Sequence, residues 1–234
     1  MNNIVEVTGL NKKFGRKSVL EDTSFTIAPN KIVGLMGPNG SGKTTVLKIL
    51  AGLSKKNSGE VMINGLPVGV DTKNLISFMP DENILYSWFR VKDGIKFYQD
   101  FFPDFDIAKC NDMLNFMDLK PTDKIKRLSK GMKERVLLTL TLSRKTKLYI
   151  LDEPLGGVDP VAKSKIIDSI LDHALEEGSS LILSTHLIKD VEKLFSDILF
   201  LKNGKIALSG DCEELRSEKN KNIEELYLEV FGNA

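Results

Sequence analysis

The residues best suited to do chemistry form one stretch, Gly37-Pro38-Asn39-Gly40-Ser41-Gly42-Lys43-Thr44. It has the spacing of a phosphate-binding loop, in which glycines let the backbone curl so that successive N–H groups point at an anion. The spacing predicts that Lys43 reaches the β- and γ-phosphates of a nucleotide, that the Thr44 hydroxyl binds Mg²⁺, and that Thr45 adjoins the same site. A chance Gly-rich turn is the alternative, and the complete match with its flanking apolar residues disfavours it.

Two carboxylates follow the apolar run 148–151. Asp152 and Glu153 are predicted to lie at the carboxyl end of a strand, where open α/β sheets bind ligands. Asp152 is placed to hold Mg²⁺ through its water shell, and Glu153 to take a proton from an attacking water. Alone, the pair would equally fit a strand end that turns polar in solvent. Beside a phosphate-binding loop, the functional interpretation is the stronger one.

The chain has two histidines, and their contexts differ. A lone histidine is more often a satisfied polar residue than a functional one. His186 ends the strand predicted after the one that carries Glu153, so both side chains can reach one site. His173 lies within a predicted helix and has no such context.

The elements that must position these residues follow from hydrophobic patterning. Short β-rich runs with tight turns predict an antiparallel subdomain first, and strands alternating with helices later predict a mainly parallel core sheet, an α/β fold. A small helical insert is predicted over about 83–145, and a terminal helical region over about 211–234, within one domain covering 1–234. The predicted strands are 4–10, 24–27, 31–36, 60–63, 75–79, 148–151, 181–184, 198–202 and 205–209; the predicted helices are 43–51, 91–101, 107–117, 161–175 and 187–194. Asp159 before Pro160, and Asp211 with Glu214, have the pattern of helix N-caps.

Composition limits the class of protein. Lys plus Arg number 33 and Asp plus Glu 32 in 234 residues, so bulk charge cannot bind a polyanion. The most apolar runs are far shorter than the roughly 20 residues of a membrane-spanning helix, and the first six residues lack the pattern of a signal peptide. Cys110 and Cys212 stand far apart without a CxxC motif, which indicates reduced, inert thiols in a cytosolic protein.

Four further segments accompany the loop and the carboxylates in a fixed order: Lys13-Phe14-Gly15, Leu128-Ser129-Lys130-Gly131-Met132, Leu155-Gly156-Gly157-Val158-Asp159 and Ser184-Thr185-His186. In this order they resemble the adenine-stacking aromatic, the signature, the D-loop and the switch histidine of ABC (ATP-binding cassette) transporter nucleotide-binding subunits. The resemblance covers nearly the whole chain.

The resemblance implies an ABC ATPase of the P-loop NTPase fold that hydrolyses ATP with Mg²⁺. Phe14 and residues 37–45 would bind the nucleotide, with Lys43, Glu153 and His186 catalytic. Two subunits would pair head to tail, so that Ser129, Lys130, Gly131 and Met132 of one contact the ATP of the other, with Asp159 in the D-loop. ATP would close the pair, and hydrolysis would reopen it.

Three residues depart from the family pattern. Lys130 replaces a glycine and Met132 a glutamine of the signature, as in ATPases that resemble bacterial peptide-export and peptide-resistance transporters. Asp81 stands where the family has the Q-loop glutamine, and its carboxylate can face Mg²⁺ or its waters.

Trp88 lies in Leu85-Tyr86-Ser87-Trp88-Phe89, where the family binds its transmembrane subunit. Two interpretations of this aromatic cluster are open, an interface anchor and packing in the core of the insert.

We therefore expect the motor subunit of a bacterial ABC transporter, peripheral on the inner face of the cell membrane, with a transmembrane permease as partner. It would work as a homodimer or with a related ATPase, without nucleic acid. Export, of peptides or other amphipathic or toxic compounds, is the expected direction. The alternatives are a soluble ABC ATPase acting on ribosomes or DNA, an ABC importer motor, and a small-molecule kinase, which would leave the signature and the switch histidine without a role.

Overall fold

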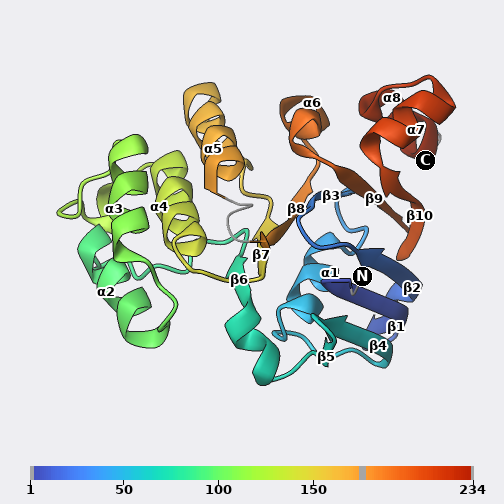
Figure 1. Ribbon diagram of the computed structural model, residues 1–234, viewed down its shortest axis with the longest axis horizontal. Helices are drawn as coiled ribbons and strands as arrows, with labels where there is room; N and C mark the ends of the chain where they lie inside the picture. Colours follow the sequence, from blue (N-terminus) through green and yellow to red (C-terminus); the bar gives the residue numbers. More distant parts are fainter. Residues whose placement is uncertain (1–2, 174–177, 233–234) are drawn as a thin grey trace.

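Two β-sheets and a group of helices beside them make up the computed structural model, which describes residues 3–173 and 178–232 (Figure 1). The smaller sheet has the strand order β2-β1-β4-β5 and is antiparallel throughout. Its strands are β1 (Val5–Phe14), β2 (Lys17–Ile27), β4 (Ser58–Ile63) and β5 (Leu66–Pro67). The predicted N-terminal antiparallel subdomain is confirmed.

The larger sheet has the order β10-β9-β3-β8-β7-β6. Every neighbouring pair in it is parallel except β10 with β9, which form a hairpin through Asn203-Gly204. The strands are β3 (Ile32–Met36), β6 (Ile76–Met79), β7 (Leu148–Asp152), β8 (Ser180–Thr185), β9 (Asp197–Lys202) and β10 (Lys205–Asp211). The carboxyl ends of β3, β7 and β8 therefore lie side by side.

Helices cover both faces of the larger sheet. The described helices are α1 (Lys43–Leu50), α2 (Val91–Phe101), α3 (Ile107–Phe116), α4 (Lys130–Leu142), α5 (Pro160–His173), α6 (Ile188–Val191), α7 (Cys212–Lys219) and α8 (Ile223–Phe231). Turns of 3₁₀ helix span Asp71–Leu75, Ile125–Arg127 and Glu192–Leu194. In Figure 1, α2, α3 and α4 stand together beyond β6, within the range predicted for the helical insert.

The central strands are apolar on both faces because both faces are covered. On β3, Val33 and Leu35 belong to an apolar cluster with α1 and the antiparallel sheet, whereas Ile32 and Met36 belong to a second cluster with the helices. This alternation fixes the register, since a one-residue slip would exchange the two faces.

Arg144 joins the helical group to the larger sheet. Its guanidinium donates to both Asp104 carboxylate oxygens, at 3.0 and 2.9 Å, and to the carbonyl oxygen of Ile76 at 2.7 Å. It also lies 4.0 Å from the centre of the Phe102 ring. The planar fork of donors therefore holds the segment before α3 against β6.

Most predicted elements are found, with a few differences. β1 and β2 are longer than predicted, the helix predicted over 187–194 is α6 followed by a 3₁₀ turn, and the terminal region is two helices. Asp159 and Asp211 accept hydrogen bonds from the first turns of α5 and α7, as N-caps do. The predicted end of α5 at 175 and the side chain of His173 lie outside the described residues.

Both cysteines are buried and unpaired. Burial raises the pKa of the Cys110 thiol to about 11 and that of the Cys212 thiol to about 12. Both therefore stay protonated at neutral pH, as expected of inert thiols.

Candidate active site

The loop 37–42 connects the end of β3 to the start of α1. Gly42, at the N-cap of α1, has a φ of 110°, a conformation that favours glycine. A Cβ atom at Gly37 would lie 2.4 Å from the carbonyl oxygen of Leu201, so only glycine fits there. The loop thus turns tightly and aims the N-terminus of α1 at the space above β3.

Lys43 is folded over this loop and is 6% exposed. Its Nζ donates to the carbonyl oxygens of Gly37 and Pro38, at 2.8 and 3.3 Å. The same Nζ lies 3.6 Å from Oε1 of Glu153. The ammonium therefore stands between the phosphate-binding loop and the end of β7.

Asp152 ends β7 and is fully buried. Its Oδ1 accepts hydrogen bonds from the hydroxyls of Thr44, at 3.2 Å, and Ser184, at 2.6 Å. Burial is the main cause that raises the pKa of Asp152, and the two hydroxyls oppose it. Its Oδ2 is buried without a hydrogen-bond partner in the described structure, so the carboxylate has capacity for a further ligand.

This arrangement fits a hydrated Mg²⁺. Mg²⁺ prefers oxygen ligands, and phosphates and water usually complete its shell beside one or two protein groups. The Thr44 hydroxyl and the unpaired carboxylate oxygen of Asp152 are ligands of this kind. Among residues 3–173 and 178–232, no group of three or more His, Cys, Asp or Glu side chains is placed to hold a metal ion.

Glu153 lies between two candidate catalytic groups. Its Oε2 is 2.9 Å from Nδ1 of His186, and its Oε1 faces Lys43. Its backbone has a φ of 49°, which a non-glycine residue adopts at a cost. The backbone N–H of Glu153 donates to the Ser184 hydroxyl at 2.9 Å, which fixes this turn against β8.

Lys43 and Glu153 open onto a hollow of about 340 Å³, whereas His186 lines a different one. The lining of the first hollow contains the predicted residues Lys43, Thr44 and Thr45 together with Asp81 and Glu153. Lys17 and Val19 also line it; sequence reasoning missed them, because nothing in the spacing showed that β2 passes the loop. Phe14 is 55% exposed and carries the Lys12 ammonium 4.5 Å from its ring centre. Its stacking on adenine stays a prediction.

The signature residues lie elsewhere in the chain. Ser129 caps α4 by accepting a hydrogen bond from the backbone N–H of Met132 at 3.2 Å. Leu128 and Met132 line a separate hollow of about 420 Å³ with Arg90 and Arg127. Lys130 is exposed and reaches over Gly157 in the predicted D-loop. One chain therefore does not bring its signature and its phosphate-binding loop to the same hollow.

Glu134 is a buried acid that sequence reasoning missed. It lies in α4 and is 4% exposed. Burial raises its pKa to about 7; the Lys130 ammonium opposes this shift and the Asp81 carboxylate adds to it. The sequence signal that could have found it is an acidic residue two positions before the apolar run 136–142.

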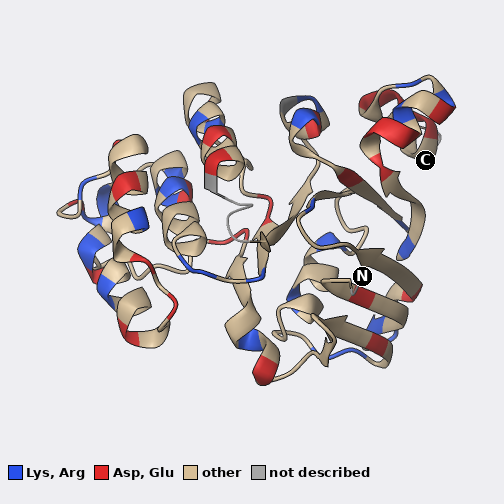
Figure 2. Cartoon of the chain, in the orientation of Figure 1, with Lys and Arg blue, Asp and Glu red and all other residues tan. Residues whose placement is uncertain are grey.

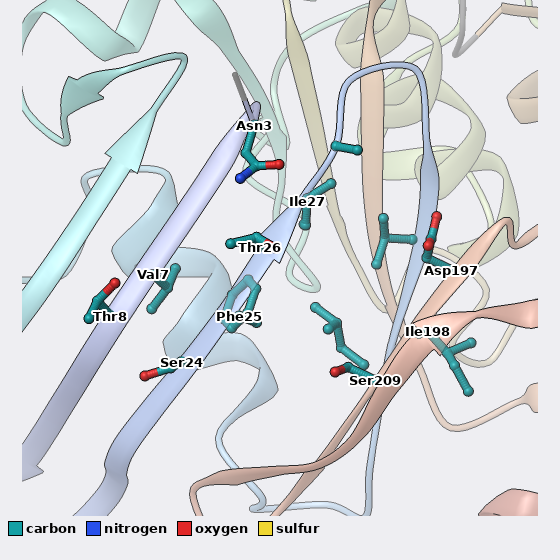
Figure 3. A pocket seen from close by; sticks show the side chains of 14 residues that line it. Asn3, Val7, Thr8, Ser24, Phe25, Thr26, Ile27, Asp197, Ile198 and Ser209 are labelled. Atoms are coloured by element: carbon teal, nitrogen blue, oxygen red, sulfur yellow. The ribbon is translucent and has the colours of Figure 1, made fainter. Parts of the chain in front are cut away.

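Away from this site, the described residues include a helical group of mixed charge (Figure 2) and a further hollow. Figure 2 shows acidic and basic residues intermixed along α2, α3 and α4. A hollow of about 550 Å³ lies between β1–β2 and β9–β10, where Figure 3 shows Thr26, Ile27 and Asp197. It contains none of the predicted site residues.

Comparison with known proteins identifies the class. Residues 20–156 match the sequence pattern of the family described as "ABC transporter". The chain belongs to this family of ATP-binding cassette proteins, and it is an ATPase of the P-loop fold.

Individual relatives cover almost the whole chain. The lantibiotic transport ATP-binding protein SrtF of Streptococcus pyogenes is 31% identical over 226 residues, 96% of this chain and 96% of that protein. A solved ATP-binding subunit of an ABC transporter superposes with a TM-score of 0.86 at 26% identity, over 97% of this chain and 99% of the other. A dimeric post-hydrolysis state of the cassette MJ0796 with ADP and phosphate superposes with a TM-score of 0.78 at 23% identity, over 88% of this chain and 98% of the other.

Among the described residues, no helix has the length and apolar character needed to cross a membrane. The solved MJ0796 cassette is a dimer.

Proposed function

We propose that the hollow beside the phosphate-binding loop binds ATP and hydrolyses it by in-line attack of water on the γ-phosphate. The observation that carries this proposal is the Glu153 carboxylate between the Lys43 ammonium and the His186 imidazole. Glu153 takes the proton of the attacking water, His186 orients the water or the γ-phosphate, and Lys43 stabilises the charge that develops on the phosphate oxygens.

Nucleotide binding is assigned to Phe14, to the phosphate-binding loop and to Thr45. Thr44, Asp152 and Asp81 would hold Mg²⁺, and the unpaired Oδ2 of Asp152 supports this assignment. When bound, Mg²⁺ neutralises charge on the phosphates. The buried hydroxyl of Ser184 keeps the Asp152 carboxylate in place.

We also propose a head-to-tail dimer in which each ATP lies between two chains. The separate positions of the signature and the phosphate-binding loop in one chain support this arrangement. Ser129, Lys130, Gly131 and Met132 would face the γ-phosphate of the partner's ATP, at the positive end of α4. Asp159 of the D-loop would lie at the same interface.

The surface for the membrane partner is assigned to Tyr86, Trp88 and Phe89, just before α2. Trp88 is 73% exposed and Tyr86 is 52% exposed. Their rings stack at 4.5 Å between centres, and Phe89 meets both edge-on. The exposure of Trp88 argues against core packing, and a rigid aromatic group of this kind is typical of interface anchors.

The whole chain is one domain, with the helical insert over about 83–145, that drives a separate permease from the cytoplasmic face of the membrane. We propose export of peptides or other amphipathic compounds. The likeness to the lantibiotic transport protein and the Lys130–Met132 signature support that cargo. Homodimers and pairs with a related ATPase are both compatible with this function.

The proposal is tested by titrating the purified protein with a fluorescent ATP analogue in the presence of Mg²⁺. Lys43→Ala is expected to weaken binding by at least about tenfold, which corresponds to about 1.4 kcal/mol. Lys48→Ala on the same helix is the matched control and should bind normally. Undiminished affinity of Lys43→Ala would contradict the assignment of the loop.

A further inference from the structure

The C-terminal helix α8 lies against the segment that follows His186. β8 ends at Thr185, His186 meets Glu153, and the chain then enters α6, which contacts α8 (Figure 1). A hollow of about 350 Å³ lies between them, lined by His186 and Lys189 on one side and by Glu224, Tyr227 and Leu228 on the other. The C-terminal helix is therefore a neighbour of the catalytic histidine.

α8 is itself firmly attached to the larger sheet. The Tyr227 ring lies 5.6 Å from the Phe200 ring of β9 and 4.3 Å from the Phe231 ring, centre to centre. The Lys202 ammonium donates to the carbonyl oxygen of Val230. Asn222 and Glu225 form a capping box at the start of the helix. The aromatic ring of Tyr227 therefore has a fixed position relative to β9.

One ion pair joins the segment after His186 to α8. The Lys189 ammonium pairs with the Glu224 carboxylate at 3.1 Å. Leu187 and Tyr227 both pack on the apolar cluster that contains Ile188 and Phe200. Burial and the Glu153 carboxylate both raise the pKa of the Tyr227 phenol, so the ring lies within electrostatic range of the candidate base.

Among the described residues, one polar contact orients the His186 side chain. The side chain is 46% exposed, and its described polar contact is the one with Glu153. An imidazole at the end of a strand stays aligned only as well as the backbone that carries it.

We propose that Tyr227 is a positioning residue for His186. Its ring supports the segment 186–189 and keeps the imidazole within hydrogen-bonding distance of Glu153. In the described structure the Tyr227 hydroxyl makes no hydrogen bond, so the ring rather than the hydroxyl is the active part. The inference rests on the catalytic role of His186 under the proposed function.

The test is the steady-state ATPase activity of the full chain with Tyr227→Ala, Tyr227→Phe, His186→Ala and the double alanine variant. Tyr227→Ala is expected to lower kcat roughly ten- to a hundredfold, because small misplacements of a reacting group can cost that much. The KM for ATP should stay unchanged, since the ring does not touch the nucleotide hollow. Tyr227→Phe keeps the ring and should retain the kcat of the original protein.

The double variant separates positioning from general stability. If Tyr227 acts through His186, adding Tyr227→Ala to His186→Ala causes no further loss, because residues that act as a unit are not additive. Glu224→Gln should cause a smaller loss of kcat. Glu229→Gln, which removes the ion pair between α8 and Lys221, should leave kcat unchanged. Thermal melting checks folding, and Tyr227→Leu replaces the alanine variant if that protein does not fold.

An unchanged kcat in Tyr227→Ala, or an equal loss in both backgrounds, overturns the inference while the proposed function stands. An unchanged kcat in His186→Ala removes the proposed role of His186 and this inference with it.

Discussion

Glu153 shows at the scale of one residue how the fold prepares an active site. Its left-handed backbone costs about 1–3 kcal/mol in a non-glycine residue, and hydrogen bonds to Ser184 offset that cost. The turn brings one carboxylate oxygen toward Lys43 and the other toward His186. A more relaxed backbone at this position would point the carboxylate in another direction.

The substitution Glu153→Gln keeps the shape of the side chain and removes the base. We expect kcat to fall by a factor of about 10² to 10⁴, the usual contribution of a positioned base, with ATP affinity retained. Phosphate release and nucleotide titration measure the two quantities. Turnover equal to that of the original protein would exclude Glu153 as the base.

At the scale of elements, Glu134 makes α4 sensitive to pH. Its pKa is raised to about 7 in the folded protein, mainly by burial, and lies near 4.3 in an unfolded chain. The stability that protonated Glu134 contributes is complete below about pH 4 and is lost as pH rises through about 7. Ionisation therefore weakens the fold across the neutral range.

We expect the free energy of unfolding to fall by about 1–3 kcal/mol between pH 5 and pH 8 through this group. Glu134→Gln should reduce that fall, and Glu213→Gln, on the exposed first turn of α7, serves as the control. Urea unfolding at several pH values provides the measurement. Identical pH profiles for Glu134→Gln and the original protein would contradict the assignment.

The connection between the helical group and the sheet depends on Arg144. Arg144→Ala leaves Asp104 and the Ile76 carbonyl without their donor, and we expect a loss of about 2–4 kcal/mol in the free energy of unfolding. Arg127→Ala, at an exposed position, is the control. A melting temperature within about 1 °C of the original would show that this connection is weak.

Elements with a strong local signal were predictable, and those set by distant contacts were not. The ranges of α2, β7 and the phosphate-binding loop follow from periodicity and spacing, which act within a few residues. The position of Asp152 and Glu153 beside Lys43 followed from the rule that parallel strands share a carboxyl edge. The proximity of Tyr227 to the site depends on how α8 folds back onto β9, and no local pattern encodes that return.

At the scale of the whole molecule, the membrane partner that we propose would bind the exposed aromatic residues just before α2. Trp88→Ala and Tyr86→Ala are expected to reduce co-purification with a co-expressed permease by at least about tenfold, since anchor residues contribute about 2 kcal/mol or more. ATP binding by the free subunit should stay unchanged. Phe101→Ala, another exposed aromatic residue at 65% exposure, is the control. Equal recovery of all three variants would place the partner on another surface.

We propose that ATP holds two chains together and that its hydrolysis separates them. Sedimentation of Glu153→Gln with ATP and Mg²⁺, and again with ADP and Mg²⁺, measures whether the two chains stay together. We predict a dimer with ATP and a monomer with ADP. A monomer at saturating ATP, or a dimer that is equally stable with ADP, would contradict the account.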